Sequence, residues 1–570
     1  MKQFQDSIIT ILRGLLSRTD IDVHVTVPDD ARFGDLTSNS ALIYAKECNT
    51  SPPELARTII EKITQSDTHT RYTNLEEKNG FINATLAVDV LTASAHTHLS
   101  NELPTDHNRS TLKPFIVEYF QNNVAKPPHV GHVRSAVIGD SLVRILRYLG
   151  YPVISDTHIG DWGTQFGLLI YAFKTMGDRA VIEKDPINEL NKLYVALSKK
   201  IETDVTLHDK GKAEFLKLEQ GDSENRELWQ WFVDVSLKDF EHYRDVLGLL
   251  PFDYNLGESF YEQHMPAVLA EFTDKGLVKK GETGEQYVDL EEFGLGRCIL
   301  IKSDGATTYH MRDFATYIYR KKEFDFARNI YVVDNRQTHH FKQLFRVLDC
   351  AGYPALSDSI HVEFGFMSLP EGPISTRKGT TVSLDALLGE ATSRARAIID
   401  EKNPDLDDKE KVATAVGLGA IKYFDLSHNR TTEIVFNWDS ALSFDGNSGP
   451  YLQYTHARLR GILRRAGATD AHQFSQIDTS TLTSTERLLL RQMYFFQNTL
   501  KKSVEDYYPN IVCEYLFTLA SLANTYYQQT PILQEENTSI RQFRLFLITG
   551  VTHILKTGLS LLSIDAPDAM

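Results

Sequence analysis

Two histidines flank a glycine in the segment His129-Val-Gly-His132. Residues three apart share one face of a helix, and a helix N-terminus presents free N–H groups and a partial positive charge to anions. Gly131 lacks a Cβ and would let a flat ligand approach the backbone closely. The segment is therefore suited to the phosphates and the nucleoside of ATP. Alone it is a weak signal, because two histidines on a helix surface would give the same pattern.

A second segment, Ile374-Ser-Thr-Arg-Lys-Gly379, combines hydroxyl groups, two cations and a glycine. Its polar members are Ser375, Thr376, Arg377 and Lys378. Such a loop could clasp a departing pyrophosphate, because a preorganised cation acts most strongly where charge develops in the transition state. An ordinary basic surface loop would have the same composition, so this segment is also weak when taken alone.

Both segments follow expected strands of one sheet. The apolar run Phe115–Phe120 indicates a buried strand, and a mostly polar loop leads to a helix expected from about Val130 to Leu149, closed by Gly150. Tyr151–Ser155 indicates the next strand of a βαβ unit. The pattern resumes with a strand at Asn329–Asp334, a helix through Phe341–Leu348 and a strand at His361–Met367. In a doubly wound parallel sheet, both loops would converge on one crevice although they lie far apart in the sequence.

The composition is that of a soluble globular protein. The chain has 570 residues, of which 42% are hydrophobic and 24% charged, and this length suggests about three or four domains. No run reaches the roughly 18 apolar residues of a membrane span, and the first residues lack the features of a secretory signal or a transit peptide. The four cysteines are too widely spaced for a zinc-binding CxxC pair. A cytoplasmic protein with reduced thiols is therefore expected.

Three domains are expected along the chain. Residues 1–108 should form an α+β domain, because Phe4, Ile8, Leu12 and Leu15 recur at helical spacing, Ser51-Pro-Pro-Glu54 is a capping-box pattern, and residues 80–86 alternate as a strand does. A polar linker at residues 100–113 precedes a catalytic domain at 109–400. Charged, helix-prone residues from about 178 to 300 predict a helical insertion in that domain. Residues 401–570 should form a helical domain without strands.

Together the two loops resemble the HIGH and KMSKS signatures of class I aminoacyl-tRNA synthetases. Four longer segments are similar to those of arginyl-tRNA synthetases in particular: Asn123-Val-Ala-Lys-Pro-Pro-His-Val-Gly-His132, Gly160-Asp-Trp-Gly-Thr-Gln-Phe-Gly167, Gly446-Asn-Ser-Gly-Pro-Tyr-Leu-Gln-Tyr454 and the closing Leu559–Met570. The resemblance covers essentially the whole chain. It implies an α/β catalytic domain with the Rossmann-like doubly wound parallel sheet of class I synthetases, an N-terminal α+β domain that reads the tRNA elbow, and an all-helical C-terminal anticodon-binding domain.

The resemblance also implies an activity. Arginine and ATP would form arginyl-adenylate and pyrophosphate, and the arginyl group would then pass to the 3′-terminal adenosine of tRNA(Arg). L-arginine, ATP and tRNA(Arg) are the expected partners, with Mg²⁺ expected to accompany ATP and no protein metal ligand assigned. The family generally requires bound tRNA before it activates arginine, and it is commonly monomeric.

The KMSKS-like loop departs from the general pattern, since Pro373 and Thr376 stand at the places of its two lysines. Most arginyl enzymes share the loss of the second lysine, and the resemblance implies that Lys126, three residues before His129, replaces it. Either lysine could reach the phosphates from its own loop. A solvated lysine before a Pro-Pro bend is the structural alternative.

A site that selects arginine needs fixed acids, because the guanidinium is planar, always charged and forks onto carboxylates. Tyr309 and Asp313 are four residues apart and share a face if their segment is helical. The resemblance assigns Glu118, Tyr309 and Asp313 to the guanidinium, and Asn123, Gln337 and His132 to the amino and carboxylate groups. Asp313 could instead form a surface pair with Arg312, and Glu118 could be an ordinary strand-edge residue.

One departure lies beside this expected pocket. The family usually has Ser-(Ser/Ala)-Pro-Asn before Val-Ala-Lys, whereas this chain has Phe120-Gln-Asn-Asn123. Asn123 is retained, but the small serine and the proline are not. Roles carried over to Gln121 are therefore in doubt, and an altered pocket with weaker substrate affinity is an open alternative.

The net charge of −16 would argue against a polyanionic partner if charge were uniform. It is not, because residues 446–469 contain four arginines and no acid. Aromatic rings and guanidinium planes stack on unpaired RNA bases, so Tyr451, Tyr454 and Arg458 are the predicted tRNA-binding residues, with His456 beside them. Core packing of the two tyrosines is the structural alternative.

Two other functions remain open on the sequence. A small adenylyltransferase also carries H-x-G-H, but it would lack the anticodon-like C-terminal third. A synthetase-like RNA-binding protein without catalysis is suggested by the changes at Phe120–Asn122, although His129, His132 and Lys126 are intact.

Overall fold

The computed structural model describes residues 1–28, 30–99, 112–368, 383–467 and 482–570. Its contacts divide the chain into two compact units. Unit 1 comprises Met1–Pro104, Thr455–Lys501 and Tyr515–Thr557, and unit 2 comprises Thr105–Tyr454, Lys502–Glu514 and Gly558–Met570. The N-terminal residues thus share a unit with C-terminal helices. Most of the expected linker at 100–113 lies outside the described residues.

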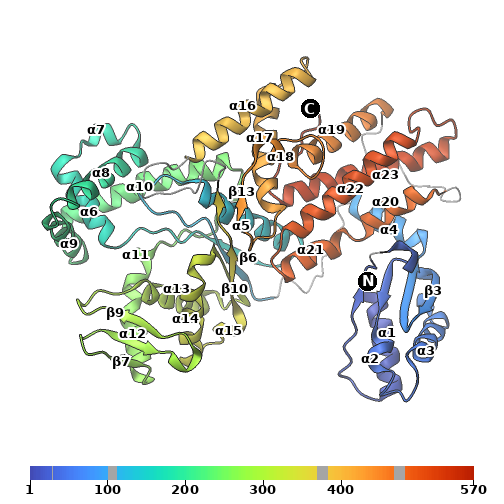
Figure 1. The fold of residues 1–570 in the computed structure, drawn as a ribbon, viewed down its shortest axis with the longest axis horizontal. Helices are drawn as coiled ribbons and strands as arrows, with labels where there is room; N and C mark the ends of the chain where they lie inside the picture. Colours follow the sequence, from blue (N-terminus) through green and yellow to red (C-terminus); the bar gives the residue numbers. More distant parts are fainter. Residues whose placement is uncertain (29, 100–111, 369–382, 468–481) are drawn as a thin grey trace. The chain divides into compact units, whose positions relative to one another are not determined.

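Unit 2 is built on a four-stranded sheet of order β11-β10-β5-β6 (Figure 1). Its strands are β5 (Phe115–Glu118), β6 (Val153–Asp156), β10 (Arg328–Asp334) and β11 (Ser359–Phe364). Every pairing is parallel. Helix α5 (Val130–Tyr148) connects β5 to β6, and α14 (Thr338–Cys350) connects β10 to β11. The predicted doubly wound sheet is confirmed, and its strands fall where the sequence placed them.

Helix α5 is packed tightly against its own strand. A Cβ at Gly139 would lie 2.3 Å from the Tyr119 Cβ, so only glycine allows this approach. Arg134, which is buried, places its Nε 3.1 Å from the Asp425 carboxylate and donates to the Gly365 carbonyl at 2.6 Å. Gly150 follows the helix with a φ of +83°, as expected for a residue that ends a helix in the left-handed region. These contacts fix the helix whose N-terminus carries His129.

The insertion between β6 and β10 has two parts. The first is helical and contains α6 (Thr164–Met176), α7 (Arg179–Ile182), α8 (Pro186–Ile201), α9 (Thr206–Glu219), α10 (Ser223–Val246), α11 (Glu258–Tyr261) and α12 (Met265–Asp274). The second is an antiparallel sheet of β7 (Val278–Lys280), β8 (Gln286–Asp289) and β9 (Arg297–Ile301). The prediction of helix up to residue 300 is wrong for this part, because three short strands pair with one another and bury Val288, Cys298 and Leu300. Helix α13 (Tyr309–Phe324) follows.

The described residues after Ser383 are mainly helical, as predicted. They form α16 (Leu384–Lys402), α17 (Lys409–Leu426), α18 (Trp438–Ala441), α19 (Gly449–Ala466), α20 (Ser484–Tyr494), α21 (Phe496–Glu505), α22 (Asn510–Gln529) and α23 (Thr538–Leu561). The expectation that no strand occurs here is wrong at one point, where β13 (Ile434–Val435) pairs in parallel with β12 (Met367–Ser368). Within the described part of the chain, no helix combines the length and apolar character needed to cross a membrane.

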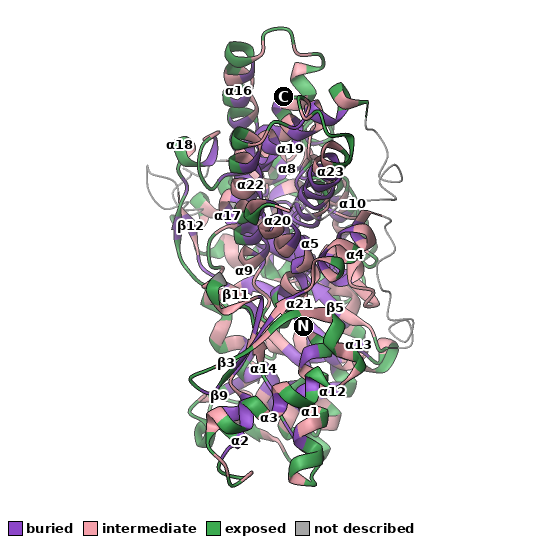
Figure 2. Ribbon diagram, turned by 90° about the vertical axis from the view of Figure 1, so that its right-hand side faces the viewer, coloured by how far each residue is buried: buried purple, intermediate pink, exposed green. Residues whose placement is uncertain are grey.

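The N-terminal part of unit 1 is α+β, as predicted. Its sheet has the order β1-β2-β4-β3, made of β1 (Val25–Thr26), β2 (Leu36–Ser38), β3 (Tyr72–Lys78) and β4 (Phe81–Leu86). Helices α1 (Lys2–Leu16), α2 (Ser40–Tyr44), α3 (Pro52–Thr64) and α4 (Val88–Leu99) accompany the sheet and carry both buried and exposed residues (Figure 2). Phe4, Ile8 and Leu12 are buried whereas Leu15 is exposed. The predicted capping box of Ser51 and Glu54 is present.

One buried carboxylate joins this sheet to α20 within unit 1. Asp35 is 1% exposed, and its two oxygens lie 2.6 Å from Arg487 and 2.8 Å from Arg491. It also accepts the backbone N–H of Leu86 at 2.7 Å. A buried charge is tolerated when it is paired and hydrogen-bonded, and Asp35 meets both conditions.

Candidate active site

A cavity of about 620 Å³ lies at the carboxyl ends of β5 and β10, within unit 2. This is the crevice where open α/β sheets bind ligands, and its volume is within the usual range for ligand pockets. The structure brings together eight residues that the sequence singled out: Glu118, Asn123, His129, Gly131, His132, Tyr309, Asp313 and Gln337 line this cavity. Their roles stay predictions, but their convergence is now a structural fact.

The N-terminus of α5 forms one wall. His129 is its N-cap: its Nδ1 accepts the N–H of Gly131 at 3.1 Å, and its own N–H donates to His132 Nδ1 at 3.1 Å. The two ring centroids are 4.0 Å apart. A Cβ at Gly131 would come within 2.8 Å of the His129 ring. The His129 ring lies over residue 131 and leaves room only for glycine. The structure thus explains Gly131 by this ring contact, whereas the sequence suggested the approach of a ligand.

Both histidines are neutral near pH 7. Burial, followed by the positive charge of Arg336, lowers the pKa of His129. Burial and the neighbouring His129 lower the pKa of His132 to about 3. Neutral rings can donate or accept a hydrogen bond but carry no charge. The positive potential at this wall therefore comes from the helix terminus and nearby cations.

Lys126 does not line this cavity. Its Nζ lies 5.6 Å from the centroid of the Tyr194 ring on α8, in a small hollow that it shares with Gln165 and Phe166. Burial lowers the pKa of Lys126. Its side chain is half-buried, so the structural alternative of a fully solvated lysine does not describe it.

Glu118, the last residue of β5, is held by a buried arginine. Arg320 NH2 lies 2.6 Å from the Glu118 carboxylate and 2.7 Å from that of Asp156. Although burial alone would lower the pKa of Arg320, Glu118 and Asp156 raise it well above its ordinary value. Two acids therefore share one cation. This pairing, between residues far apart in the sequence, distinguishes Glu118 from an ordinary edge residue.

The predicted helical spacing of Tyr309 and Asp313 is confirmed by α13. Asp313 pairs with His340 Nε2 at 2.6 Å rather than with Arg312. Burial alone would raise the pKa of Asp313, but the His340 contact outweighs it and the pKa is lowered. Tyr309 is 68% exposed, and Arg312 lies 5.6 Å from its ring centroid. The tyrosine thus stands at the mouth of the cavity and is free to cover a ligand.

Glu258 is a cavity-lining acid that the sequence gave no reason to select. It opens α11, and its Oε2 is buried without a hydrogen-bond partner among the described residues. Arg312 Nε is 3.7 Å from it but only 2.8 Å from Glu262. Burial raises the pKa of Glu258 to about 7. No motif or spacing marks it, because it lies in the insertion and reaches the cavity only through the fold.

Three further cavity residues were also missed: His158, Arg336 and His340. Arg336 forms two hydrogen bonds with Asp334, at 2.7 and 3.0 Å. Its position directly before Gln337, after a strand that the sequence did predict, is the signal that could have identified it.

The loop after β5 explains the departure at residues 120–123. Phe120 is 2% exposed and has a φ of +57°, a left-handed conformation that is uncommon for a bulky residue. Its N–H donates to Ser135 Oγ at 2.9 Å. Gln121 Nε2 donates to Glu118 at 3.1 Å, so Gln121 supports a predicted arginine-binding acid. Phe120 turns into the core while Asn123 stays at the cavity.

The KMSKS-like residues Ser375, Thr376, Arg377 and Lys378 lie outside the described residues. The described residues on either side of them are close to the cavity. Met367 of β12 lines it, and Ser383 forms a backbone bridge with His129.

The predicted tRNA-binding residues lie on α19. Tyr451, Tyr454 and Arg458 are all half-buried. Tyr454 packs edge-on against Phe444 at 6.0 Å, and Arg458 lies 5.7 Å from the Tyr527 ring centroid. His456 is fully buried, so it does not present its ring on the surface.

Comparison with known families agrees with this arrangement. Residues 96–438 match the family model described as tRNA synthetases class I (R), catalytic domain. Residues 452–570 match the DALR anticodon binding domain, and residues 2–86 match the arginyl tRNA synthetase N terminal domain.

Individual relatives extend over nearly the full length. The chain is 38% identical over 557 residues to the arginine–tRNA ligase of Clostridioides difficile, covering 97% of each chain. It is 39% identical over 565 residues to that of Lactococcus lactis subsp. cremoris, covering 98% of this chain and 97% of the relative. Among solved structures, the Thermus thermophilus arginyl-tRNA synthetase superposes with a TM-score of 0.84 at 26% identity, covering 100% of both chains. The chain therefore belongs to the arginyl-tRNA synthetases, the class I enzymes that charge tRNA(Arg) with arginine.

Proposed function

We propose that the 620 Å³ cavity is where this chain joins arginine to ATP, as arginyl-adenylate, before transfer to tRNA(Arg). One observation carries the proposal. A helix N-terminus with two neutral histidines forms one wall, and three carboxylates, from Glu118, Glu258 and Asp313, meet in the same cavity. The first wall suits a polyphosphate, and the acids suit a guanidinium.

ATP is proposed to lie along the N-terminus of α5. The ring of His129 and the backbone at Gly131 would face the nucleoside, while His132 hydrogen-bonds the reacting region as a neutral donor. Because these groups are already fixed by the capping contacts, they need no reorganisation as negative charge develops on the α-phosphate. Alignment of the arginine carboxylate with that phosphorus then supplies much of the rate enhancement.

Arginine is proposed to bind with its guanidinium toward Glu118, Asp313 and Glu258. Glu118 and Asp313 are already oriented by Arg320 and His340, whereas Glu258 lacks a hydrogen bond and can take the ligand directly. Tyr309 would cover the ligand at the cavity mouth. Asn123, Gln337 and His132 would hold the amino and carboxylate groups. A lysine substrate would leave fixed acceptors unpaired, which gives discrimination without editing.

Pyrophosphate release is assigned to Lys126 and to the loop residues Ser375, Thr376, Arg377 and Lys378. Support for the loop comes from its flanks, because Met367 lines the cavity and Ser383 bridges to His129. Support for Lys126 is its position in the turn that leads directly into α5. Its ammonium must leave Tyr194 or extend past it to reach the phosphates.

The tRNA-binding roles remain proposals of the same kind. The N-terminal domain, taken as residues 1–108, is proposed to read the tRNA elbow. The helical domain from residue 401 to 570 is proposed to read the anticodon with Tyr451, Tyr454 and Arg458, and residues 109–400 form the catalytic domain between them. The chain is proposed to act as a monomer in the cytoplasm; the cytoplasmic part of this proposal agrees with the free state of all four cysteines.

Mg²⁺ is proposed to enter with ATP. Among the residues that the structure describes, no three histidine, cysteine or acidic side chains form a group that could hold a metal ion. Mg²⁺ commonly binds through substrate phosphates and water rather than through an all-protein cage.

Arginine-dependent exchange between pyrophosphate and ATP, measured with and without tRNA(Arg), tests the proposal. We expect exchange with arginine and cognate tRNA, and little exchange with lysine. No exchange even with tRNA would remove the catalytic assignment, and equal exchange with lysine would remove the assignment of the acids to guanidinium recognition.

A further inference from the structure

The side chain of Lys126 is enclosed by the helical insertion. Val124 and Ala125 precede it in the chain, and Phe166 and Leu169 of α6 and Tyr194 of α8 complete the hollow around it. The aliphatic stem of a lysine can pack on apolar surface while the ammonium stays accessible. This hollow therefore restricts the aliphatic stem of Lys126, and the groups near the ammonium determine where the ammonium points.

The Tyr194 ring is one of these groups. Lys126 Nζ lies 5.6 Å from its centroid, within the range of a cation–π interaction. The Lys126 ammonium has no hydrogen bond or ion pair with any residue in the described ranges, unlike the ammonium groups of Lys174 and Lys321. The ring is therefore the feature that orients this ammonium.

The pair lies at the edge of the active-site cavity. Burial and His129 are the main causes of the low pKa of His132, and the charge of Lys126 adds to them. Burial is the main cause of the raised pKa of Tyr309; Glu258 and Tyr194 add to it in smaller part, whereas the charge of Arg312 lowers it. Lys126 is thus near enough to His132 for its charge to act on a residue of the cavity.

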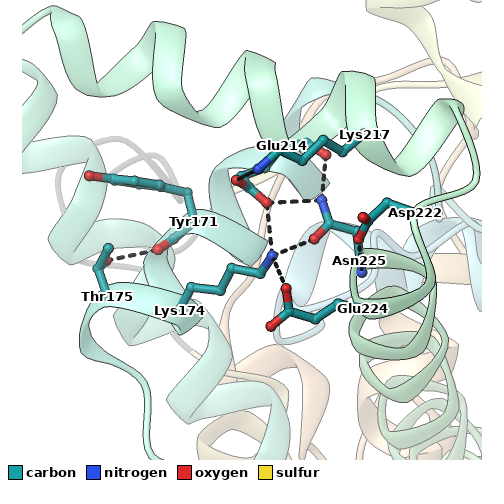
Figure 3. Close-up of polar contacts among 8 residues, drawn as sticks. All are labelled: Tyr171, Lys174, Thr175, Glu214, Lys217, Asp222, Glu224 and Asn225. Carbon is teal, nitrogen blue, oxygen red and sulfur yellow. Dashed lines mark hydrogen bonds and ion pairs between the residues drawn. The ribbon is translucent and has the colours of Figure 1, made fainter.

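The helices around Lys126 are locked by a polar cluster, defined here as Lys174, Glu214, Lys217, Glu224 and Asn225. Figure 3 shows Lys174 of α6 reaching Glu214 of α9 at 3.0 Å and Glu224 of α10 at 2.7 Å. It also reaches Asn225 Oδ1 at 2.6 Å, and Asn225 Nδ2 donates to Glu214 at 2.9 Å (Figure 3). Three helices, α6, α9 and α10, are thereby joined at one point of the insertion.

We propose that Tyr194 is a positioning residue for arginine activation, holding the Lys126 ammonium beside the cavity until the ATP phosphates arrive. The inference rests on the proposed role of Lys126. A lysine without a partner would extend into water. On binding, ATP would then have to displace the water around the ammonium and fix its orientation. A ring contact keeps the ammonium partly desolvated and oriented, yet it is weak enough to be exchanged for a phosphate contact.

Four variants test the inference: Tyr194→Phe, Tyr194→Leu, Lys126→Ala and the Tyr194→Leu/Lys126→Ala double variant. Phenylalanine keeps the π face, and leucine keeps apolar bulk without it. In pyrophosphate exchange with tRNA(Arg) and arginine, Tyr194→Leu should lower kcat/KM for ATP roughly fivefold while Tyr194→Phe stays within about twofold of wild type. In the Lys126→Ala background, Tyr194→Leu should have no further effect.

The possible failures are distinct. If Lys126→Ala is impaired but Tyr194→Leu is not, the positioning role is wrong and the role of Lys126 stands. An equal loss from Tyr194→Leu with and without Lys126 would also overturn it, because the tyrosine would then act on the fold. Near-normal exchange by Lys126→Ala would overturn the lysine assignment and this inference with it.

Discussion

Two acids with buried carboxylate oxygens, one in each unit, have opposite surroundings. Asp35 in unit 1 is contacted by Arg487, Arg491 and the Leu86 N–H. Glu258 in unit 2 has a buried oxygen with no hydrogen-bond partner in the described structure, and burial raises its pKa to about 7. Folding alone accounts for the first arrangement. The second is costly for folding, and it agrees with the proposed role of Glu258 in binding a cationic ligand.

The same contrast separates cations of unit 2. Lys174 is fully engaged with Glu214, Glu224 and Asn225, whereas Lys126 has only the Tyr194 ring. In this comparison Asp35 and Lys174 join separate elements, whereas Glu258 Oε2 at the cavity and the Lys126 ammonium have no hydrogen-bond partner in the described residues. Polar satisfaction is therefore a guide to function here that residue type is not, and variants can test it from both sides.

The largest effect is expected at Asp35. Asp35→Ala leaves two arginines without their acid, and breaking a buried pair in this way costs about 3–5 kcal/mol. We expect a correspondingly lower free energy of unfolding for the transition that includes unit 1, measured by urea denaturation. Asp30→Ala is the matched control, because its Arg32 contact of 2.6 Å is on the surface. Equal destabilisation by both variants would show that burial of the pair does not matter.

Loss of Lys126 should affect catalysis rather than stability. Lys126→Ala removes a proposed transition-state cation, and we expect pyrophosphate exchange to slow by about 10²–10³, as for loss of one preorganised donor. The unfolding transition should change little. Lys210→Ala is the control, since Lys210 also lies beside an aromatic ring, 5.9 Å from the Tyr171 ring centroid, but has no proposed contact with the substrates. Comparable rates for the two variants would contradict the assignment.

Glu258→Gln should weaken arginine selectively. A hydrogen bond to a charged group contributes about 1.5–3 kcal/mol, so kcat/KM for arginine should fall roughly 10- to 100-fold while KM for ATP is nearly unchanged. Glu262→Gln is a demanding control, because Glu262 binds the same Arg312 but does not line the cavity. If kcat/KM for arginine falls as much in Glu262→Gln as in Glu258→Gln, the fall results from disturbing Arg312 and not from a lost contact with arginine.

The pKa of Glu258 makes the same site dependent on pH. Because its pKa is raised to about 7, the carboxyl is largely protonated at pH 6 and ionised at pH 8. Only the ionised form attracts a guanidinium, so kcat/KM for arginine should rise as pH increases through about 7 and then level off. His132, with a pKa of about 3, does not titrate in this window. If Glu258→Gln shows the same pH profile of kcat/KM for arginine as the wild type, Glu258 is not the titrating group.

Local sequence patterns predicted several helices and strands correctly. The helix beginning after His129, its end at Gly150 and the strands of the parallel sheet all follow from periodicity and breaker residues. The strands β7 to β9 were missed because they are short, carry charged residues such as Lys279 and Lys280, and are stabilised by pairing with one another. Composition there resembles the charged helices before it.

Partners across long distances in the sequence could not be predicted in this way. Glu118 was identified, but its pairing with Arg320 depends on how α13 crosses the sheet. Glu258 was not identified, because nothing in its local sequence distinguishes it from the other acids of the insertion. Residue type and spacing thus identified most of the predicted cavity residues. Which of these residues form ion pairs with one another, and which do not, depends on the tertiary structure.

The smallest effect is expected from the polar cluster around Lys174. Burial alone would raise the pKa of Glu214, but hydrogen bonds from Lys217, Asn225 and Lys174 together lower it to about 2 from an ordinary value of 4.5. A depressed carboxyl pKa adds stability that is present above about pH 4.5 and is lost as pH falls toward about 2. Lys174→Met should therefore lower the free energy of unfolding by about 2 kcal/mol at pH 7, and the difference from wild type should shrink by pH 3.

The control for this variant is Lys192→Met, which removes an exposed lysine that contacts Glu189 at 2.6 Å. Surface pairs contribute little, so its unfolding curve should follow that of wild type at both pH values. Because Lys174 does not line the cavity and has no proposed substrate contact, Lys174→Met should keep pyrophosphate exchange at temperatures where it is folded. A loss of exchange without a loss of stability would mean that the satisfied cluster also has a catalytic role, and the contrast between satisfied and under-satisfied groups would then no longer separate structure from function.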